Sequence, residues 1–133
     1  MRLLLDSGVW FRASANLPLP SALIRQIKDA SEVWLCPISV QEILYKWRHG
    51  RWVGPSLDTW LTESLLGCRL AAVTFEAARL AGTWDWSHGD PHDRLLAAVA
   101  ETQQLTLVHT DRALKELPGF PQKYFRGLDL ASS

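Results

Sequence analysis

The sequence has few of the features that mark several large classes of protein. It has only two cysteines in 133 residues, Cys36 and Cys68, too few for a disulfide framework or a cysteine-rich zinc site. We expect both to be buried free thiols. No apolar run approaches the roughly 18 residues that a membrane span requires, so no membrane association is expected. The apolar run at residues 3–5 ends at Asp6 and is too short for a signal peptide, which favours a cytoplasmic protein.

The sequence also lacks an excess of charge of either sign. Fourteen lysines and arginines balance fourteen aspartates and glutamates, so no long-range field attracts nucleic acid or an anionic membrane. A polyanionic substrate must therefore be bound locally, by clustered basic side chains or by metal ions. Apolar residues make up 47% of the chain and charged residues 21%, as in ordinary globular proteins, and the length predicts one domain over residues 1–133.

Short apolar runs alternate along the chain with segments of helical periodicity. This alternation predicts an α/β domain with a mainly parallel central sheet, in which ligands bind beyond the carboxyl ends of the strands. We expect the first and fourth strands to be adjacent or nearly so. The predicted strands are 2–5, 33–37, 70–73, 105–109 and 124–128, and the predicted helices are 21–28, 39–50, 56–66, 75–80, 111–117 and one that begins at 90–91.

Four acidic residues from distant segments are expected to meet at one edge of this sheet. Asp6 directly follows the first strand, and Asp111 follows the strand at 105–109. Glu42 and Asp93 each lie in the first turn of a predicted helix. Because helices that follow parallel strands begin at the edge where the strands end, the four carboxylates should converge there.

Convergence of like charges costs free energy, since carboxylates a few ångströms apart cannot all ionise unaided. A divalent cation removes that cost, and oxygen ligands without histidine or cysteine favour Mg²⁺ or Mn²⁺ over zinc. Such an ion polarises a phosphoryl oxygen and activates water, which is the chemistry of phosphodiester hydrolysis. The histidines show no metal-binding spacing of their own; they are His49, His88, His92 and His109.

Most of these acids also have a structural explanation. Ser39 and Glu42 match a capping box, in which the glutamate bonds back to the backbone amide of the serine. Asp90 and Asp111 each fit the N-cap of the helix that follows, and Asp93 lies where the helix dipole favours an acid. The aspartate that ends the first strand has no comparable structural reason, so it is the strongest candidate for a direct metal ligand.

The segments that carry the acids also occur together in a known family. They are 3–7 (Leu-Leu-Leu-Asp-Ser), 39–43 (Ser-Val-Gln-Glu-Ile), 90–98 (Asp-Pro-His-Asp-Arg-Leu-Leu-Ala-Ala) and 109–111 (His-Thr-Asp). In this order they resemble the PIN domain, in the branch that contains VapC-type toxins, over nearly the whole chain. Ser7 replaces a commoner threonine, Gly8 a frequent histidine and His92 a frequent phenylalanine, while all four acids are in place.

The resemblance implies a three-layer α/β/α fold with a central, mainly parallel sheet, and a Mg²⁺- or Mn²⁺-dependent endoribonuclease. Many family members are toxins of type II toxin–antitoxin systems, so it also implies RNA as substrate and a cognate antitoxin as partner. Asp93 is preferred to Asp90 because it directly precedes the Arg-Leu-Leu-Ala-Ala run. The residues implied to bind metal and act in catalysis are Asp6, Glu42, Asp93 and Asp111, with Ser7, Asp90 and Thr110 supporting them.

Basic and aromatic side chains near the acids are candidates for contacts with RNA or a partner. Arg94 and Arg112 each follow a proposed acid and are expected to contact RNA. Trp84 and Trp86 either stack on unpaired bases or pack in the core. Three further tryptophans predict a partly exposed apolar surface, covered by a second copy in a homodimer or by the antitoxin. These are Trp47, Trp52 and Trp60, and the basic residues beside them are Lys46, Arg48 and Arg51.

Two other functions are open on the sequence. A PIN-like fold could act only as a binding module, although the presence of all four acids argues against it. An HD-type metal phosphohydrolase could use His92 and Asp93 with His88, but that family resembles a helical bundle, whereas this chain alternates between strands and helices. A mostly helical structure would favour this second alternative.

Overall fold

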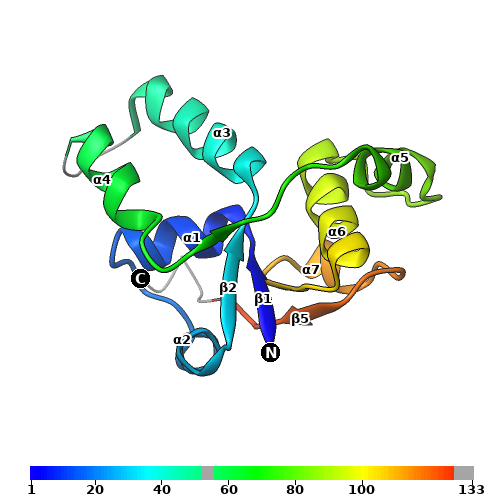
Figure 1. Ribbon diagram of the computed structural model, residues 1–133, viewed down its shortest axis with the longest axis horizontal. Helices are drawn as coiled ribbons and strands as arrows, with labels where there is room; N and C mark the ends of the chain where they lie inside the picture. Colours follow the sequence, from blue (N-terminus) through cyan, green and yellow to red (C-terminus); the bar gives the residue numbers. More distant parts are fainter. Residues whose placement is uncertain (52–55, 128–133) are drawn as a thin grey trace.

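The computed structural model describes residues 1–51 and 56–127, and within them it shows a five-stranded sheet with all strands parallel. The strand order is β3-β2-β1-β4-β5, so β1 is central and β4 is its neighbour (Figure 1). The sheet confirms the predicted α/β class and the adjacency of the first and fourth strands, and it excludes the helical bundle of an HD-type phosphohydrolase. The strands are β1 (Arg2–Leu5), β2 (Glu32–Leu35), β3 (Arg69–Leu70), β4 (Thr106–His109) and β5 (Gln122–Tyr124).

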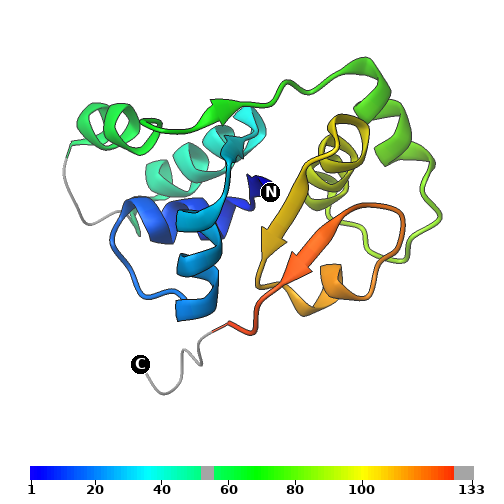
Figure 2. The same ribbon diagram turned by 60° about the horizontal axis from the view of Figure 1, so that its bottom comes forward.

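Helices cover both faces of the sheet and give the predicted three layers (Figures 1 and 2). Side chains of β1 alternate between the two cores, because Leu3 and Leu5 pack with Trp10 while Leu4 packs with Leu96. Burial of both faces is typical of a parallel sheet. One layer contains α1 (Ser7–Ser14), α2 (Ser21–Asp29), α3 (Pro37–Lys46) and α4 (Leu57–Ser64), and the other contains α5 (Phe75–Thr83), α6 (Pro91–Gln103) and α7 (Arg112–Lys115).

Helix α1 is absent from the sequence prediction, which has no helix before residue 21. It begins immediately after Asp6 and spans eight residues. Its buried apolar side chains are Val9 and Trp10, too few and too close together to give a helical period. Helix α1 packs against α3 and α4, so tertiary contacts stabilise a segment whose own pattern is weak.

Helix α3 begins earlier than the capping-box interpretation requires. Cys36 is its N-cap residue and Pro37 its first residue, a position that proline favours. Ser39 therefore lies inside the helix, where its buried Oγ accepts a hydrogen bond of 2.9 Å from Ser7 Oγ. The capping-box interpretation is wrong, and Glu42 lies in the second turn of the helix rather than the first. The chain continues from α3 into a π-helix, η1 (Trp47–Arg51).

The tryptophans of the predicted partner surface do not behave alike. Trp60 of α4 is only 3% exposed and packs against Trp10, with ring centroids 5.1 Å apart. The prediction that Trp60 is partly exposed is therefore wrong. Trp47 is half-buried, and Trp52 lies outside the described residues.

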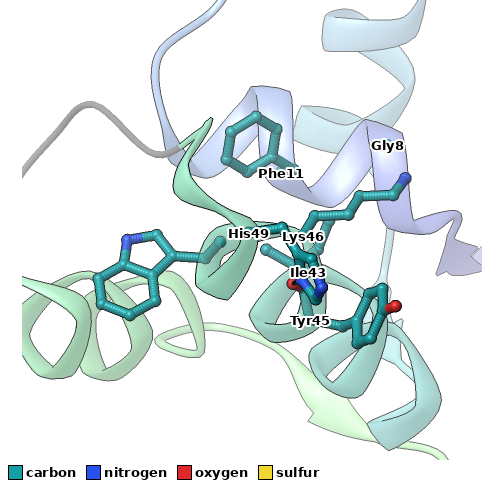
Figure 3. Close-up of a pocket in the computed structure, with 7 residues that line it drawn as sticks. Gly8, Phe11, Ile43, Tyr45, Lys46 and His49 are labelled. Atoms are coloured by element: carbon teal, nitrogen blue, oxygen red, sulfur yellow. Dashed lines mark hydrogen bonds between the residues drawn. The ribbon is translucent and has the colours of Figure 1, made fainter.

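Trp47 lines an apolar groove that runs between α1 and the end of α3 (Figure 3). Phe11 projects from α1 on one side, and Ile43 of α3 forms part of the other. The indole Nε1 of Trp47 is buried and has no hydrogen-bond acceptor in the part of the chain that the structure describes. The residues of this α1–α3 groove are Gly8, Phe11, Ile43, Tyr45, Lys46, Trp47 and His49.

The two cysteines differ in burial, so the expectation of two buried thiols holds for one of them only. Cys36 is buried, Cys68 is partly buried and both thiols are free. Burial raises the pKa of each thiol, which makes them poor nucleophiles at neutral pH. Among the described helices, none has the length and apolar character needed to cross a membrane.

Candidate functional site

Two of the predicted acids end adjacent strands at the same edge of the sheet. Asp6 follows β1, and its backbone N–H donates to the carbonyl oxygen of Val108 in β4 at 3.2 Å. Asp111 lies two residues beyond β4 and begins α7, where its Oδ1 accepts the backbone N–H of Ala113 at 2.8 Å. Asp111 is thus the N-cap that the sequence allowed, and it also lies at the edge where the carboxylates were expected to meet.

Helix α6 brings the third acid to this edge. Asp90 is its N-cap, with Oδ1 accepting the backbone N–H groups of His92 at 2.9 Å and Asp93 at 3.2 Å. The capping explanation of Asp90 is confirmed. Asp93 lies in the first turn, as predicted, and its side chain is 17% exposed.

The carboxylates lie within one another's electrostatic field. Burial, followed by the charges of Asp93 and Glu42, raises the pKa of Asp6 to about 7, against the smaller opposing effect of the backbone N–H groups of Gly8 and Ser7. Burial also raises the pKa of Asp93, and the charges of Asp90 and Asp111 add to that rise. The acids therefore share a site that disfavours their simultaneous ionisation.

Glu42 approaches this site from α3. Its side chain is 23% exposed, and its Oε1 lies 3.4 Å from Lys46 Nζ, one helical turn further on. Its charge acts on Asp6. We call Asp6, Glu42, Asp93 and Asp111 the acidic cluster.

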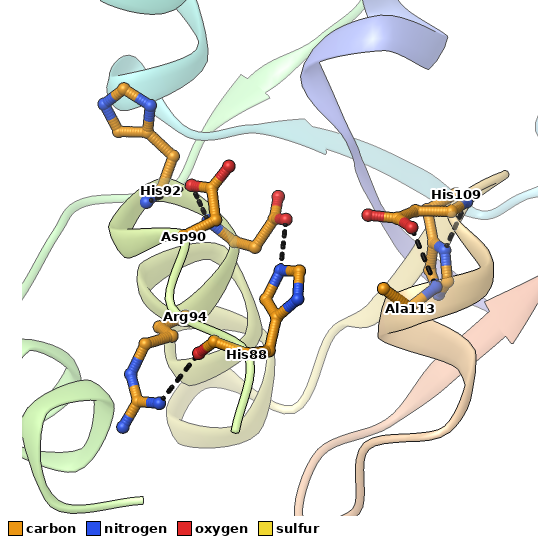
Figure 4. A network of polar contacts seen from close by, with 8 residues as sticks. His88, Asp90, His92, Arg94, His109 and Ala113 are labelled. Carbon is orange, nitrogen blue, oxygen red and sulfur yellow. Dashed lines mark hydrogen bonds and ion pairs between the residues drawn. The ribbon is translucent and has the colours of Figure 1, made fainter. Parts of the chain in front are cut away.

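A histidine outside the predicted set of metal-binding residues, named in the sequence analysis only for the HD-type alternative, lies beside this cluster. His88 Nε2 is 2.8 Å from Asp93 Oδ2 (Figure 4). One ligand atom each from His88, Asp93 and Asp111 lie within 4.8 Å of one another, and all three residues are partly buried. His88 is five residues before Asp93 and belongs to the loop that precedes α6, so no helical spacing relates the two and the sequence carries no signal of their contact.

Arg94 holds this loop instead of facing the acidic cluster. Its Nε donates to the carbonyl oxygen of Ala81 at 2.9 Å, and its Nη1 donates to that of His88 at 3.1 Å. Further hydrogen bonds reach the carbonyl oxygens of Trp84 and Trp86. The guanidinium thus binds four backbone carbonyl oxygens at the end of α5 and in the loop between α5 and α6, and its contact with RNA stays a prediction. Arg112 is exposed, and its contact with RNA stays a prediction.

Trp84 and Trp86 follow the core-packing alternative. Their rings stack on each other, with centroids 4.2 Å apart and planes 10° apart, and both pack near Phe120. Gly119 has φ of +100°, and a Cβ there would lie 2.9 Å from Trp84 Nε1. Glycine at this position therefore leaves room for the Trp84 ring, which packs against Phe120 at the edge of the core.

A buried histidine fixes the backbone beside Asp111. His109 is fully buried at the end of β4; its Nδ1 accepts the backbone N–H of Asp111 at 3.1 Å, and its Nε2 lies 2.7 Å from Gln122 Oε1. Gln122 in turn donates to the carbonyl oxygen of Leu117 at 2.8 Å. Burial lowers the pKa of His109, which is consistent with a neutral ring that donates from Nε2. Thr110 lies between His109 and Asp111 in the chain, and it packs against Gly127.

The sequence pattern of the PIN domain matches residues 3–119. The chain belongs to the PIN domain family. No curated protein matches it by sequence. The match covers β1, β4 and all four acids of the cluster, as the resemblance implied.

Among solved structures, chains of toxin–antitoxin complexes have folds similar to that of this PIN domain. DNA-bound VapBC from Salmonella typhimurium matches with TM-score 0.71 and 17% identity, over 93% of this chain and 98% of that one. VapBC2 from Rickettsia felis, bound to a promoter DNA fragment, matches with TM-score 0.69 and 15% identity over the same shares. VapBC-5 from Mycobacterium tuberculosis matches with TM-score 0.61 and 20% identity, over 93% and 97%. At these identities, the likeness shows the shared fold.

The residues of the site fit a divalent cation. An octahedral ion with bonds of about 2.1 Å spans roughly 4.2 Å between opposite ligands, so groups whose ligand atoms lie within 4.8 Å of one another need only small rotations to share it. Burial, and to a smaller extent the charges of neighbouring carboxylates, raises the pKa values of Asp6 and Asp93, and a bound positive ion would offset both effects. The donor set can therefore hold a metal ion.

Proposed function

We propose that this PIN domain is a Mg²⁺- or Mn²⁺-dependent endoribonuclease and the cytoplasmic toxin of a type II toxin–antitoxin pair. The observation that carries the proposal is the meeting of Asp6, Asp93 and Asp111 at the carboxyl edge of adjacent strands in a PIN fold. A bound divalent ion supplies a Lewis acid that polarises the phosphodiester and activates water. The acidic cluster would hold such an ion by its negative charge, and the positive ion would in turn attract the anionic substrate phosphate.

The chain supplies few basic groups for RNA around this cluster. Arg112 is exposed directly after Asp111, and Lys46 and Arg48 are exposed at the end of α3 and in η1; the side chain of Arg51 lies outside those described. With no net positive charge, affinity for RNA must come from these local groups and from the metal. Because few lysines and arginines are available to contact phosphates, binding should depend only weakly on salt concentration.

The α1–α3 groove supports an antitoxin as partner. Its walls are mostly apolar, and Gly8, which lines it, lies only two residues from Asp6; a Cβ at Gly8 would lie 3.6 Å from Asp6 Oδ2. A peptide segment that filled the groove as far as Gly8 would lie next to Asp6 and block access to the acidic cluster. The predicted homodimer stays a prediction, which light scattering of the purified protein would test.

An assay against a panel of RNAs tests the enzyme directly. We expect cleavage with Mg²⁺ or Mn²⁺, loss of cleavage in excess EDTA, and a fall by orders of magnitude in Asp6→Asn, which keeps the size of the side chain and removes its charge. Asp29→Asn, at the exposed end of α2, is the matched control and should cleave like the wild type. Cleavage that persists in EDTA, or an Asp6→Asn variant as active as the wild type, would contradict the proposal. Absence of cleavage with every RNA and metal would favour the binding-module alternative.

A further inference from the structure

We propose that His88 is itself a metal ligand, which gives the site one imidazole nitrogen beside the carboxylates of Asp93 and Asp111. The inference rests on the metal dependence in the proposed function and specifies the class of metal. Carboxylate oxygen suits Mg²⁺ and Mn²⁺ alike, whereas imidazole favours transition metals. The nitrogen donor shifts the preference of this site from Mg²⁺ toward Mn²⁺.

The position of the His88 ring fits a ligand. Two neighbouring ligands of an octahedral ion with bonds of about 2.1 Å lie roughly 3 Å apart, and His88 Nε2 lies 2.8 Å from Asp93 Oδ2. The third ligand atom, from Asp111, completes a group that spans no more than 4.8 Å. The imidazole of His88 extends from its loop to Asp93, and Figure 4 shows the ring of His92 pointing away from His88.

The loop that carries His88 is fixed on the side away from the metal. Arg94 Nη1 binds the carbonyl oxygen of His88 itself, and the same guanidinium holds the carbonyl oxygens of Trp84 and Trp86. Arg94 also lies 5.4 Å from the ring centroid of Trp86. Asp93 and Arg94 are consecutive in α6, so one residue contributes a carboxylate and the next holds the backbone of the proposed nitrogen ligand. Ligands held in place by surrounding hydrogen bonds bind metal more tightly than mobile ones.

A simple ion pair between His88 and Asp93 is the alternative explanation. An ion pair would stabilise the protein with or without metal and would put no nitrogen on the ion. The two explanations therefore differ in a measurable property of the bound metal, apart from any effect on catalysis.

Pulsed electron paramagnetic resonance of the Mn²⁺-loaded full chain tests the assignment. We expect coupling of Mn²⁺ to ¹⁴N in the wild type, replaced by ¹⁵N coupling when histidine is labelled, and no such coupling in His88→Asn. Calorimetric titration should show Mn²⁺ affinity lowered at least about tenfold in His88→Asn and Mg²⁺ affinity lowered by a smaller factor. His88→Asp, which replaces nitrogen by oxygen, should move the ratio of affinities toward Mg²⁺. His92→Asn is the matched control and should bind both ions like the wild type.

The outcomes separate this inference from the proposed function. Mn²⁺ that binds without nitrogen coupling in the wild type would overturn the role of His88, even if RNA is cleaved. Equal Mn²⁺ affinities of His88→Asn and wild type would do the same. Nitrogen coupling in a protein that cleaves no RNA would support His88 as a ligand and contradict the ribonuclease. A wild type that binds neither ion would overturn both.

Discussion

His109 accepts the backbone N–H of Asp111 through its Nδ1, at 3.1 Å, from a position with no exposed surface. The ring thereby joins the end of β4 to the N-cap residue of α7, and through Gln122 it joins β5 as well. One buried side chain fixes the backbone from which a carboxylate of the acidic cluster projects.

Replacing this ring should destabilise the protein. His109→Ala leaves a cavity and removes the hydrogen-bond partners of Asp111 N–H and Gln122, so we expect the free energy of unfolding to fall by about 2–4 kcal/mol. Urea denaturation measures the change. His49→Ala, at an exposed position, is the control and should change stability by no more than about 0.5 kcal/mol. A loss in His109→Ala as small as that of the control would contradict the role given to this ring.

The raised pKa of Asp6 predicts a pH-dependent stability of the metal-free protein. Its carboxyl group titrates near 7 in the folded chain, against an ordinary value of 3.8, so the folded state binds the proton more tightly than the unfolded state. This contribution is present in full below pH 4 and is lost as the pH rises through 7. In EDTA, the stability of the wild type relative to Asp6→Asn should therefore fall by about 2 kcal/mol between pH 5 and pH 8. The same relative stability at both pH values would show that Asp6 is not perturbed.

Asp90, the N-cap residue of α6, and Asp93, in its first turn, should respond differently to replacement by asparagine. Asp90→Asn should keep both stability and Mn²⁺ affinity, because asparagine caps a helix about as well as aspartate. Asp93→Asn should lose most of the metal affinity while the fold is retained. Calorimetric titration with Mn²⁺ and circular dichroism of both variants make the comparison. If Asp90→Asn lost as much affinity as Asp93→Asn, the N-cap aspartate would also be a ligand.

Arg94 should act on metal binding through the loop it holds. Arg94→Lys keeps the positive charge but cannot reach four carbonyl oxygens, so we expect faster amide hydrogen exchange at residues 84–89 and Mn²⁺ affinity about tenfold lower. Arg79→Lys, exposed on α5, is the control and should change neither. Unchanged exchange in the loop of Arg94→Lys would mean that the stacked tryptophans alone hold it.

The sequence was sufficient for the parts of this fold that depend on local pattern. Asp6 and Asp111 were found because each ends a short apolar run, and parallel strands bring such positions to one edge. Asp90 was found because an aspartate followed by proline is a strong helix start. These signals lie within a few residues of the features they predict.

What the sequence missed depends on contacts between distant segments. Trp60 is buried because α1, itself without a clear pattern, supplies Trp10 as its neighbour. His88 meets Asp93 because of a loop conformation imposed by Arg94, and no periodicity encodes the path of a loop. Arg94 appeared to be a free base next to an acid, but the carbonyl oxygens that it binds are determined only by tertiary structure.

The position of β1 in the middle of the sheet has a consequence for how the protein is made. Leu3 pairs with Val33 of β2 on one side and with Thr106 of β4 on the other. The second partner is about 100 residues further along the chain, so β1 leaves the ribosome long before β4. Pairings between such distant segments form late and slowly. The carboxylates of Asp6, Asp93 and Asp111 can therefore come together only when synthesis has passed β4, and a nascent chain stalled before that point has no complete metal site.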